Sequence, residues 1–195
     1  MQTTTQGAER YSAVGYIDEL VKAYTEIVEL PWDSAISGAE KVWFVIYDPT
    51  QERRLRLHLP EFETATRRAH HQWKLIDITD AFAHWMAAHD YRDAYFEAPD
   101  LLDLALEDFA GDLAALVAGG LAAPDADAET VVALLGVASL FGLNHVSSLL
   151  ERVRARIRGR LLVFFPGQHA GSNYRLLDAR DGWDYLAVAI TAKNT

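Results

Sequence analysis

The chain has 195 residues, half of them hydrophobic, which is enough for one domain with its own core over residues 1–195, with residues 1–8 as a flexible tail. It has no cysteine, which excludes disulfide bonds, thiolate metal sites and cysteine nucleophiles. Its formal net charge of −10 disfavours direct binding to nucleic acid, because neutralisation of phosphates by Lys and Arg drives such binding.

The first ten residues are polar and lack the basic-then-apolar pattern of a secretory signal. No apolar run approaches the ~20 residues that a membrane span needs. Together with the absence of cysteine, these features predict a cytoplasmic protein that does not associate with membranes.

The negative charge is concentrated in one segment. Between Asp90 and Glu129 there are eleven acidic residues and one basic residue, Arg92, so this segment alone carries a net charge of −10 and the rest of the chain sums to zero. Two interpretations stay open: a solvated helix face, or an acidic face that binds a basic partner.

In the first half of the chain, apolar residues at helical spacing predict a helix over Glu9–Leu30. The apolar run Val42–Tyr47 predicts a strand covered on both faces. After an ambiguous stretch of alternating leucines, Glu61–Trp73 is predicted to be helical and Leu75–Ile78 to be a third strand, followed by a helix that ends near His89.

In the second half, Asp100–Val117 predicts an amphipathic helix with Leu101 facing inward, closed by Gly119-Gly120. Thr130–Val137 predicts a strand. Asn144 is expected to cap a helix that runs to about Ile157.

The stretch that follows organises the rest of the prediction. Leu161–Phe165 is a second apolar run, and Pro166-Gly167 is expected to end this strand. Tyr174–Leu177 and Tyr185–Ile190 follow closely enough to form an antiparallel edge. Strands that alternate with helices predict a three-layer α/β/α sandwich with a mostly parallel sheet of about five to six strands.

Motifs for cofactors and catalysis are missing. There is no Gly-x-Gly-x-x-Gly, His-Glu-x-x-His or Gly-x-Ser-x-Gly pattern. The Gly167–Ser172 loop has three residues between its glycines rather than four, and Asn173 stands where a phosphate-binding loop has lysine. We therefore predict no cofactor, no metal and no catalytic residue.

Carboxylates at strand ends leave an enzymatic alternative open. Asp48, Asp77 and Asp80 stand at the ends of predicted strands, where an acidic side chain can serve as a metal ligand or general base. Asp48 and Asp80 also suit helix caps, and Pro49 favours capping by Asp48. The alternative function is a nucleotide- or metal-dependent phosphoryl-transfer or hydrolytic enzyme.

A basic segment precedes the second apolar run, with arginine at every second position: Arg152, Arg154, Arg156, Arg158 and Arg160. On a helix this spacing occupies two faces, and late arginines complement the helix dipole. Contact with an acidic partner or with nucleic acid is the other interpretation, and it gives a second alternative function, a nucleic-acid-binding accessory protein.

Several stretches over residues 42–190 occur in the order of a known family. They are Val42–Pro49, Leu135-Gly136-Val137, Val163-Phe-Phe-Pro-Gly167, Tyr174–Leu177 and Asp184-Tyr185. With them the chain resembles the small B component of BREX phage-defence systems, the BrxB-like proteins. It departs from the family pattern at Leu135 and Ala138, where the family tends to have Thr-Gly-Val-Gly, and at Leu186, where the last strand usually continues Tyr-Tyr-Arg.

The resemblance implies a non-catalytic subunit of a defence complex. The implied partners are a PglZ-like protein of the alkaline-phosphatase family and other BREX components. The predicted interaction residues are Arg152, Arg154, Arg156, Arg158, Arg160, Gly167, Tyr174, Arg175 and Tyr185.

Overall fold

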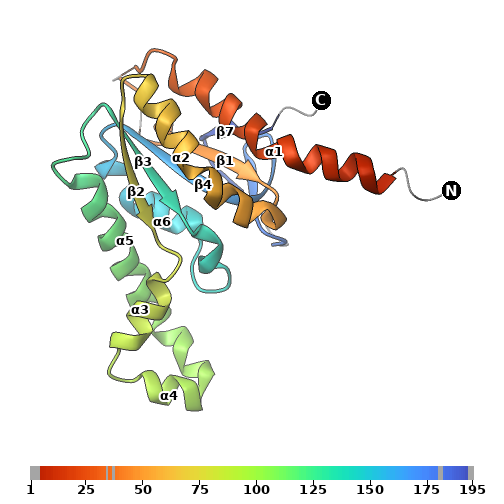
Figure 1. Ribbon diagram of the computed structural model, residues 1–195. Helices are drawn as coiled ribbons and strands as arrows, with labels where there is room; N and C mark the ends of the chain where they lie inside the picture. The colour runs from red at the N-terminus through yellow and green to blue at the C-terminus, as the bar shows by residue number, and fades with distance from the viewer. Residues whose placement is uncertain (1–4, 34, 37, 180–181, 193–195) are drawn as a thin grey trace.

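A mostly parallel β-sheet lies at the centre of the computed structural model, which describes residues 5–33, 35–36, 38–179 and 182–192 (Figure 1). The parallel strands lie in the order β2-β3-β4-β1-β7. Their bounds are β1 Val42–Tyr47, β2 Gln72–Asp77, β3 Thr130–Leu135, β4 Arg160–Ala170 and β7 Val188–Ile190. β5 (Asn173–Leu176) pairs antiparallel with the end of β4, and β6 (Trp183–Asp184) with β5.

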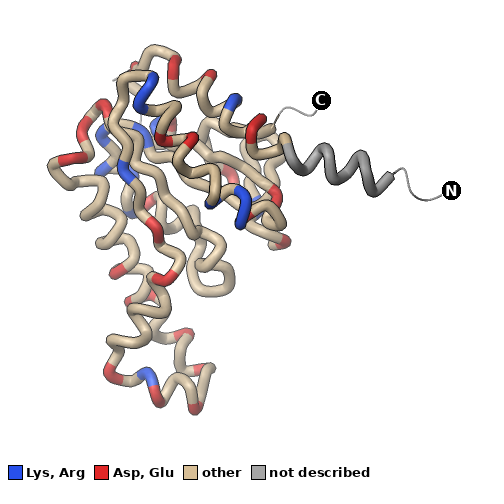
Figure 2. Tube along the Cα trace, viewed as in Figure 1, with Lys and Arg blue, Asp and Glu red and all other residues tan. Residues whose placement is uncertain are grey.

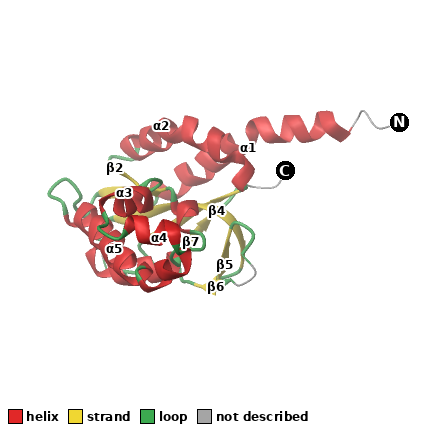
Figure 3. Ribbon diagram, turned by 90° about the horizontal axis from the view of Figure 1, so that it is seen from below, coloured by secondary structure: helices red, strands yellow, loops and turns green. Residues whose placement is uncertain are grey.

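Helices cover both faces of this sheet, which gives three layers (Figure 3). α1 (Thr5–Val28) and α2 (Glu52–Arg68) pack on one face, and α5 (Leu106–Ala122) and α6 (Val146–Val153) pack on the other. The shorter helical segments are α3 Ala81–Ala88, α4 Arg92–Glu97, η1 Pro49–Gln51, η2 Pro99–Leu104, η3 Val137–Leu140 and η4 Arg154–Arg156. The predicted α/β/α sandwich with a mostly parallel sheet is confirmed. The sheet has seven strands rather than five to six, because β6 precedes the expected strand Tyr185–Ile190, of which β7 covers only the end.

The two helical layers explain why the central strands have continuous apolar runs. Every residue of β1 is buried. Because side chains alternate along a strand, Trp43, Val45 and Tyr47 pack against α1 and α2. Their neighbours Val42, Phe44 and Ile46 pack in the core under α5 and α6. β2, at the edge of the sheet, has no fully buried residue.

The order of the strands follows from the faces on which the helices cross. α2 connects β1 to β2 over one face, in one direction across the sheet. α5 and α6 connect β2 to β3 and β3 to β4 over the other face, in the opposite direction. Because the α2 crossover differs from the α5 and α6 crossovers both in the face of the sheet and in the direction of travel, all three crossovers have the same hand.

Pro166-Gly167 does not end the strand as expected. Pro166 is the last residue of β4 that pairs with β1, opposite Tyr47, and Gly167 begins the antiparallel pairing with β5. The Pro166 carbonyl accepts a hydrogen bond from Leu177 N at 2.8 Å, so the missing proline N–H is tolerated where the strand changes partners. A side chain at Gly167 would meet the Arg175 carbonyl, which explains the glycine.

Several predicted helix boundaries are wrong. α5 continues through Gly119-Gly120 because Gly120 lets the helix approach Ile76 of β2. The expected helix from Asp100 begins instead as the 3-10 segment η2.

Further boundaries differ near α2, α6 and the N-terminus. α2 begins at Glu52, contains Pro60 and ends at Arg68, so the expected helix over 61–73 begins too late and runs too far. Asn144 does not cap α6, because His145 occupies the cap position and the helix ends at Val153. α1 begins at Thr5, within the expected tail, and residues 1–4 of that tail lie outside the described residues.

Candidate functional site

The carboxyl ends of the parallel strands meet at one edge, where open α/β sheets bind ligands. Asp48 follows β1 there and caps η1, because its carboxylate accepts hydrogen bonds from Thr50 N at 2.8 Å and Thr50 Oγ1 at 2.7 Å. The prediction that Asp48 is a cap is confirmed. Asp80 stands before α3 but makes no side-chain capping bond, so the same prediction for Asp80 is wrong.

Arg56 of α2 connects the other groups at this edge. It donates hydrogen bonds to Glu52 Oε1 at 2.7 Å, Asp77 Oδ2 at 3.1 Å and Thr79 Oγ1 at 2.7 Å. Asp77 also accepts from Thr79 N at 2.9 Å, and the buried Tyr47 donates its hydroxyl proton to Glu52. Only the pair with Glu52 follows the i,i+4 spacing of a helix, whereas Asp77 and Thr79 lie 21 and 23 residues away in the chain, so local sequence patterns do not indicate this role of Arg56.

The pKa shifts of Asp77 and Tyr47 follow from their burial and from their hydrogen bonds in the network around Arg56. Partial burial opposes ionisation of Asp77, but the hydrogen bonds from Thr79 and Arg56 outweigh it and lower its pKa. Burial, and then the hydrogen bond to Glu52, raises the pKa of Tyr47, so its hydroxyl stays a neutral donor. Contacts within the chain therefore favour the ionised form of Asp77 and the neutral form of Tyr47.

Gly136 closes the same edge. It follows β3 with φ of +92°, and a side chain there would collide with Thr79. The loop after β3 thus packs tightly against the loop after β2.

A cavity of about 500 Å³ remains beside this network. Asp77 and Asp80 line it with His84, Trp85 and Asp112. Asp112 accepts a hydrogen bond from Trp85 Nε1 at 3.1 Å. Within the described part of the chain, Asp48, Asp77 and Asp80 do not form a group of three metal ligands.

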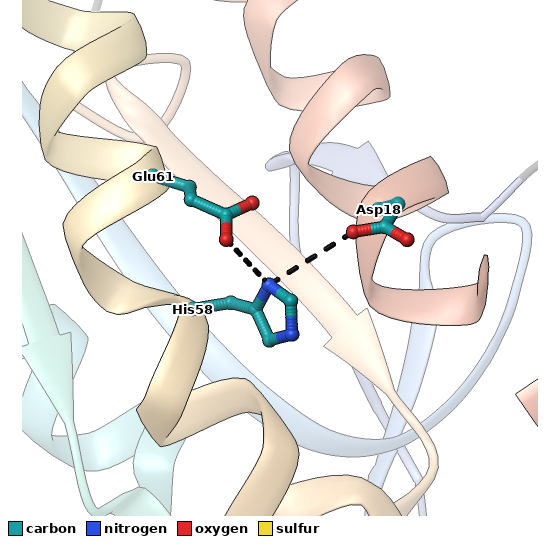
Figure 4. A group of neighbouring side chains, drawn as sticks. All are labelled: Asp18, His58 and Glu61. Carbon is teal, nitrogen blue, oxygen red and sulfur yellow. Dashed lines mark hydrogen bonds and ion pairs between the residues drawn. The ribbon is translucent and has the colours of Figure 1, made fainter. Parts of the chain in front are cut away.

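One group of three ligand-type side chains does occur, between α1 and α2 (Figure 4). His58 Nδ1 lies 2.8 Å from Glu61 Oε1 and 3.9 Å from Asp18 Oδ1. All three side chains are partly exposed. An ion pair that links the two helices accounts for this geometry.

Of the five predicted arginines, four are exposed and Arg160 is buried. Arg152 pairs with Glu107 at 2.5 Å and Arg154 with Glu151 at 3.2 Å. Arg158 donates to the carbonyls of Leu121 and Ala123 at the end of α5. These contacts stabilise the chain itself, and Arg156 is exposed.

Arg160, the first residue of β4, differs from the other four arginines because it is buried and only 5% exposed. Its guanidinium lies over the rings of Trp32 and Trp43, 4.6 and 5.7 Å from their centroids, and donates to the carbonyls of Gly159 and Asp33. Stacking and these hydrogen bonds offset part of the loss of water, but Nε has no hydrogen-bond partner and burial lowers the pKa of the guanidinium. Arg160 therefore supports the core at the amino end of the sheet.

The remaining predicted interaction residues belong largely to the core. Tyr174 and Tyr185 are buried in an aromatic cluster with Phe44 and Trp183, and Tyr174 Oη donates to the Ala187 carbonyl at 3.2 Å. Gly167 is buried as well. Arg175 is exposed and remains a candidate contact residue.

A different surface has the properties of an interaction site: the acidic arm, residues 90–104, formed by α4 and η2. It projects from the sandwich beyond α3 and α5 (Figure 1). No residue from Ala87 to Leu104 is buried. The exposed fraction is 67% for Tyr91, 70% for Phe96, 45% for Leu101 and 83% for Leu104. The expectation that Leu101 faces inward is wrong, because the segment is a 3-10 helix rather than the start of α5.

Aromatic side chains hold the base of the acidic arm. Phe82 and Trp85 of α3 pack against Phe109 of α5, with centroids 5.2 and 5.5 Å apart. His89 lies between Trp85 and Tyr95. The base is thus fixed to the core, while the outer part has only its own short helices.

The charge of the arm is largely uncompensated (Figure 2). Arg92 pairs with Asp93 at 3.3 Å and donates to the Ala87 carbonyl. Among the described residues, no ion pair reaches the other carboxylates of the arm. These carboxylates are Asp90, Glu97, Asp100 and Asp103.

Comparison with protein-family models, with curated proteins and with solved structures finds no match. In the described residues, no helix combines the length and the hydropathy that a bilayer crossing requires.

Proposed function

We propose that this chain is a non-catalytic adaptor subunit of a cytoplasmic BREX-type phage-defence complex, and that it docks on a PglZ-like partner through the acidic arm. The observation that carries this proposal is the absence of any buried residue from Ala87 to Leu104, a segment that nevertheless exposes four large apolar side chains. Grouped exposed apolar side chains mark interaction sites on globular proteins.

The energetics of short helices support a docking role. α4 and η2 have six residues each. Isolated helices shorter than ~12–15 residues are marginal in water, because most helix stability in proteins comes from tertiary packing. A partner that covers the arm would supply the packing that the chain itself does not.

Co-expression with a PglZ-like protein followed by size exclusion tests the proposal. We expect a co-eluting complex that Phe96→Ser/Leu104→Ser abolishes, since central apolar contacts each contribute about 1–2 kcal/mol to binding. Leu57→Ser/Leu186→Ser is the matched control, because these leucines are 78% and 73% exposed outside the arm. Separate elution of the wild-type proteins at micromolar concentration would overturn the proposal.

The cavity beside Asp77 and Asp80 favours one second candidate, a nucleotide- or metal-dependent enzyme. Nucleotides with Mg²⁺ or Mn²⁺ would then raise the unfolding temperature saturably, and Asp80→Asn would remove the rise. Asp80 is the suitable position because its side chain makes no capping bond, so its replacement leaves the fold intact.

A further inference from the structure

The acidic arm has two adjacent stripes of opposite character. Leu101 and Leu104 are three residues apart in η2, and a 3-10 helix has three residues per turn, so both point to one side. Asp100 and Asp103 are also three apart, which places them on a neighbouring side. The arm therefore presents an apolar stripe directly beside an acidic one.

We propose that the acidic arm binds an amphipathic helix of the partner protein, with Lys and Arg placed beside an apolar face. This inference rests on the proposed adaptor function and specifies the chemistry of the segment that the adaptor recognises. The apolar side of such a helix would cover Phe96, Leu101 and Leu104, and its basic side would face the carboxylates.

The charges determine the basic character of the partner. Asp90, Glu97, Asp100 and Asp103 are exposed and have no ion-pair partner among the described residues. Lys or Arg side chains at an interface rim would pair with them and accelerate association. Nucleic acid and anionic lipid surfaces carry the same sign of charge as the arm and are repelled.

The secondary structure of the arm determines that the partner segment is a helix. α4 and η2 are helical, so the arm offers no strand edge on which an extended peptide could add a strand. An amphipathic helix with apolar residues three and four positions apart packs its ridges against helical segments. A second copy of the chain is disfavoured as an arm-to-arm partner, because both arms are acidic.

The test uses the full chain and a labelled amphipathic peptide of about 18 residues, with Leu at i, i+3, i+4 and i+7 and Lys elsewhere. A peptide of the same composition in strict Leu-Lys alternation is the control for helical spacing, and a Leu-Glu peptide is the control for charge. We expect saturable binding by fluorescence anisotropy for the helical Leu-Lys peptide alone, with weaker binding as salt is added.

Charge reversal on the protein locates the binding surface. Glu97→Lys/Asp100→Lys should weaken binding about tenfold or more, because it replaces attraction by repulsion at the contact. Glu29→Lys/Glu63→Lys changes the net charge equally on the opposite helical layer and should leave binding within about twofold. Equal binding by the two variants, or equal binding of the alternating peptide, would overturn the inference.

The same variants separate this inference from the proposed function. If the complex with the PglZ-like protein is lost in Phe96→Ser/Leu104→Ser but is insensitive to salt and to Glu97→Lys/Asp100→Lys, the adaptor function stands and the basic helix is wrong. If light scattering shows that the isolated chain self-associates through the arm, a second copy is the occupant and the inference is also wrong.

Discussion

The network around Arg56 and the acidic arm differ in whether their charged side chains have partners within the chain. At the carboxyl edge of the sheet, Glu52, Asp77 and Thr79 all contact Arg56, so both carboxylates have a cationic partner within the chain. On the arm, four carboxylates have no ion pair among the described residues, and large apolar side chains lie beside them. The first region is built to hold the fold together, whereas the second has the features of a surface that an external partner completes.

The largest effect that tests this comparison is expected at Gly136. Gly136→Ala adds the strain of a positive φ and a collision with Thr79, so we expect a loss of about 3 kcal/mol in the free energy of unfolding. Gly142 also has a positive φ, +77°, but open space around it, and Gly142→Ala should cost only about 1 kcal/mol. Urea denaturation measures both, and equal losses would mean that the edge is not tightly closed.

A smaller effect is expected for Arg56→Ala. The change leaves Glu52 and Asp77 without their shared donor, and because the site is about one-third exposed, water replaces part of the lost interaction. We expect a loss of about 1–2 kcal/mol by urea denaturation. Arg53→Ala on the exposed side of α2 should change stability by less than about 0.5 kcal/mol, and a similar cost for both would refute a special role for Arg56.

The smallest effect is expected on the arm. Phe96→Ser/Leu104→Ser removes side chains that contribute little to the core, so the unfolding free energy should change by less than about 0.5 kcal/mol. Denaturation of the isolated chain measures this, and a loss above 2 kcal/mol would show that the two side chains support the fold rather than a partner.

Much of the architecture could be predicted from the sequence because buried parallel strands leave a simple signal. Val42–Tyr47, Val131–Leu135 and Leu161–Phe165 are continuous apolar runs, and each belongs to a central strand. Local signals failed where a distant contact decided the outcome. Gly120 resembles a helix terminator but serves a close approach to Ile76, and Pro166 resembles a strand terminator but marks a change of partner strand.

The candidate site was less accessible from the sequence. The excess of acidic residues is visible in the sequence, but the exposure of Leu101 and Leu104 is not, because the apolar spacing there predicts one continuous α-helix. The arginines over 152–160 stand out as a group in the sequence. The chain passes from α6 to β4 within this segment, so the arginines have different environments, and Arg160 is part of the core. Arg56 acts through residues 21 and 23 positions away, which no spacing rule connects.

The acidic arm lies within the crossover from β2 to β3, so another segment could replace it without a change in the sheet. It begins after α3 and ends before α5, both of which are fixed to the core through Phe82, Trp85 and Phe109. A segment inserted between two such anchors can be lengthened, shortened or grafted from another protein while the sheet keeps its register. The proposed docking surface and the core thus lie in separate parts of the chain, so a new binding specificity could arise here without repacking the interior.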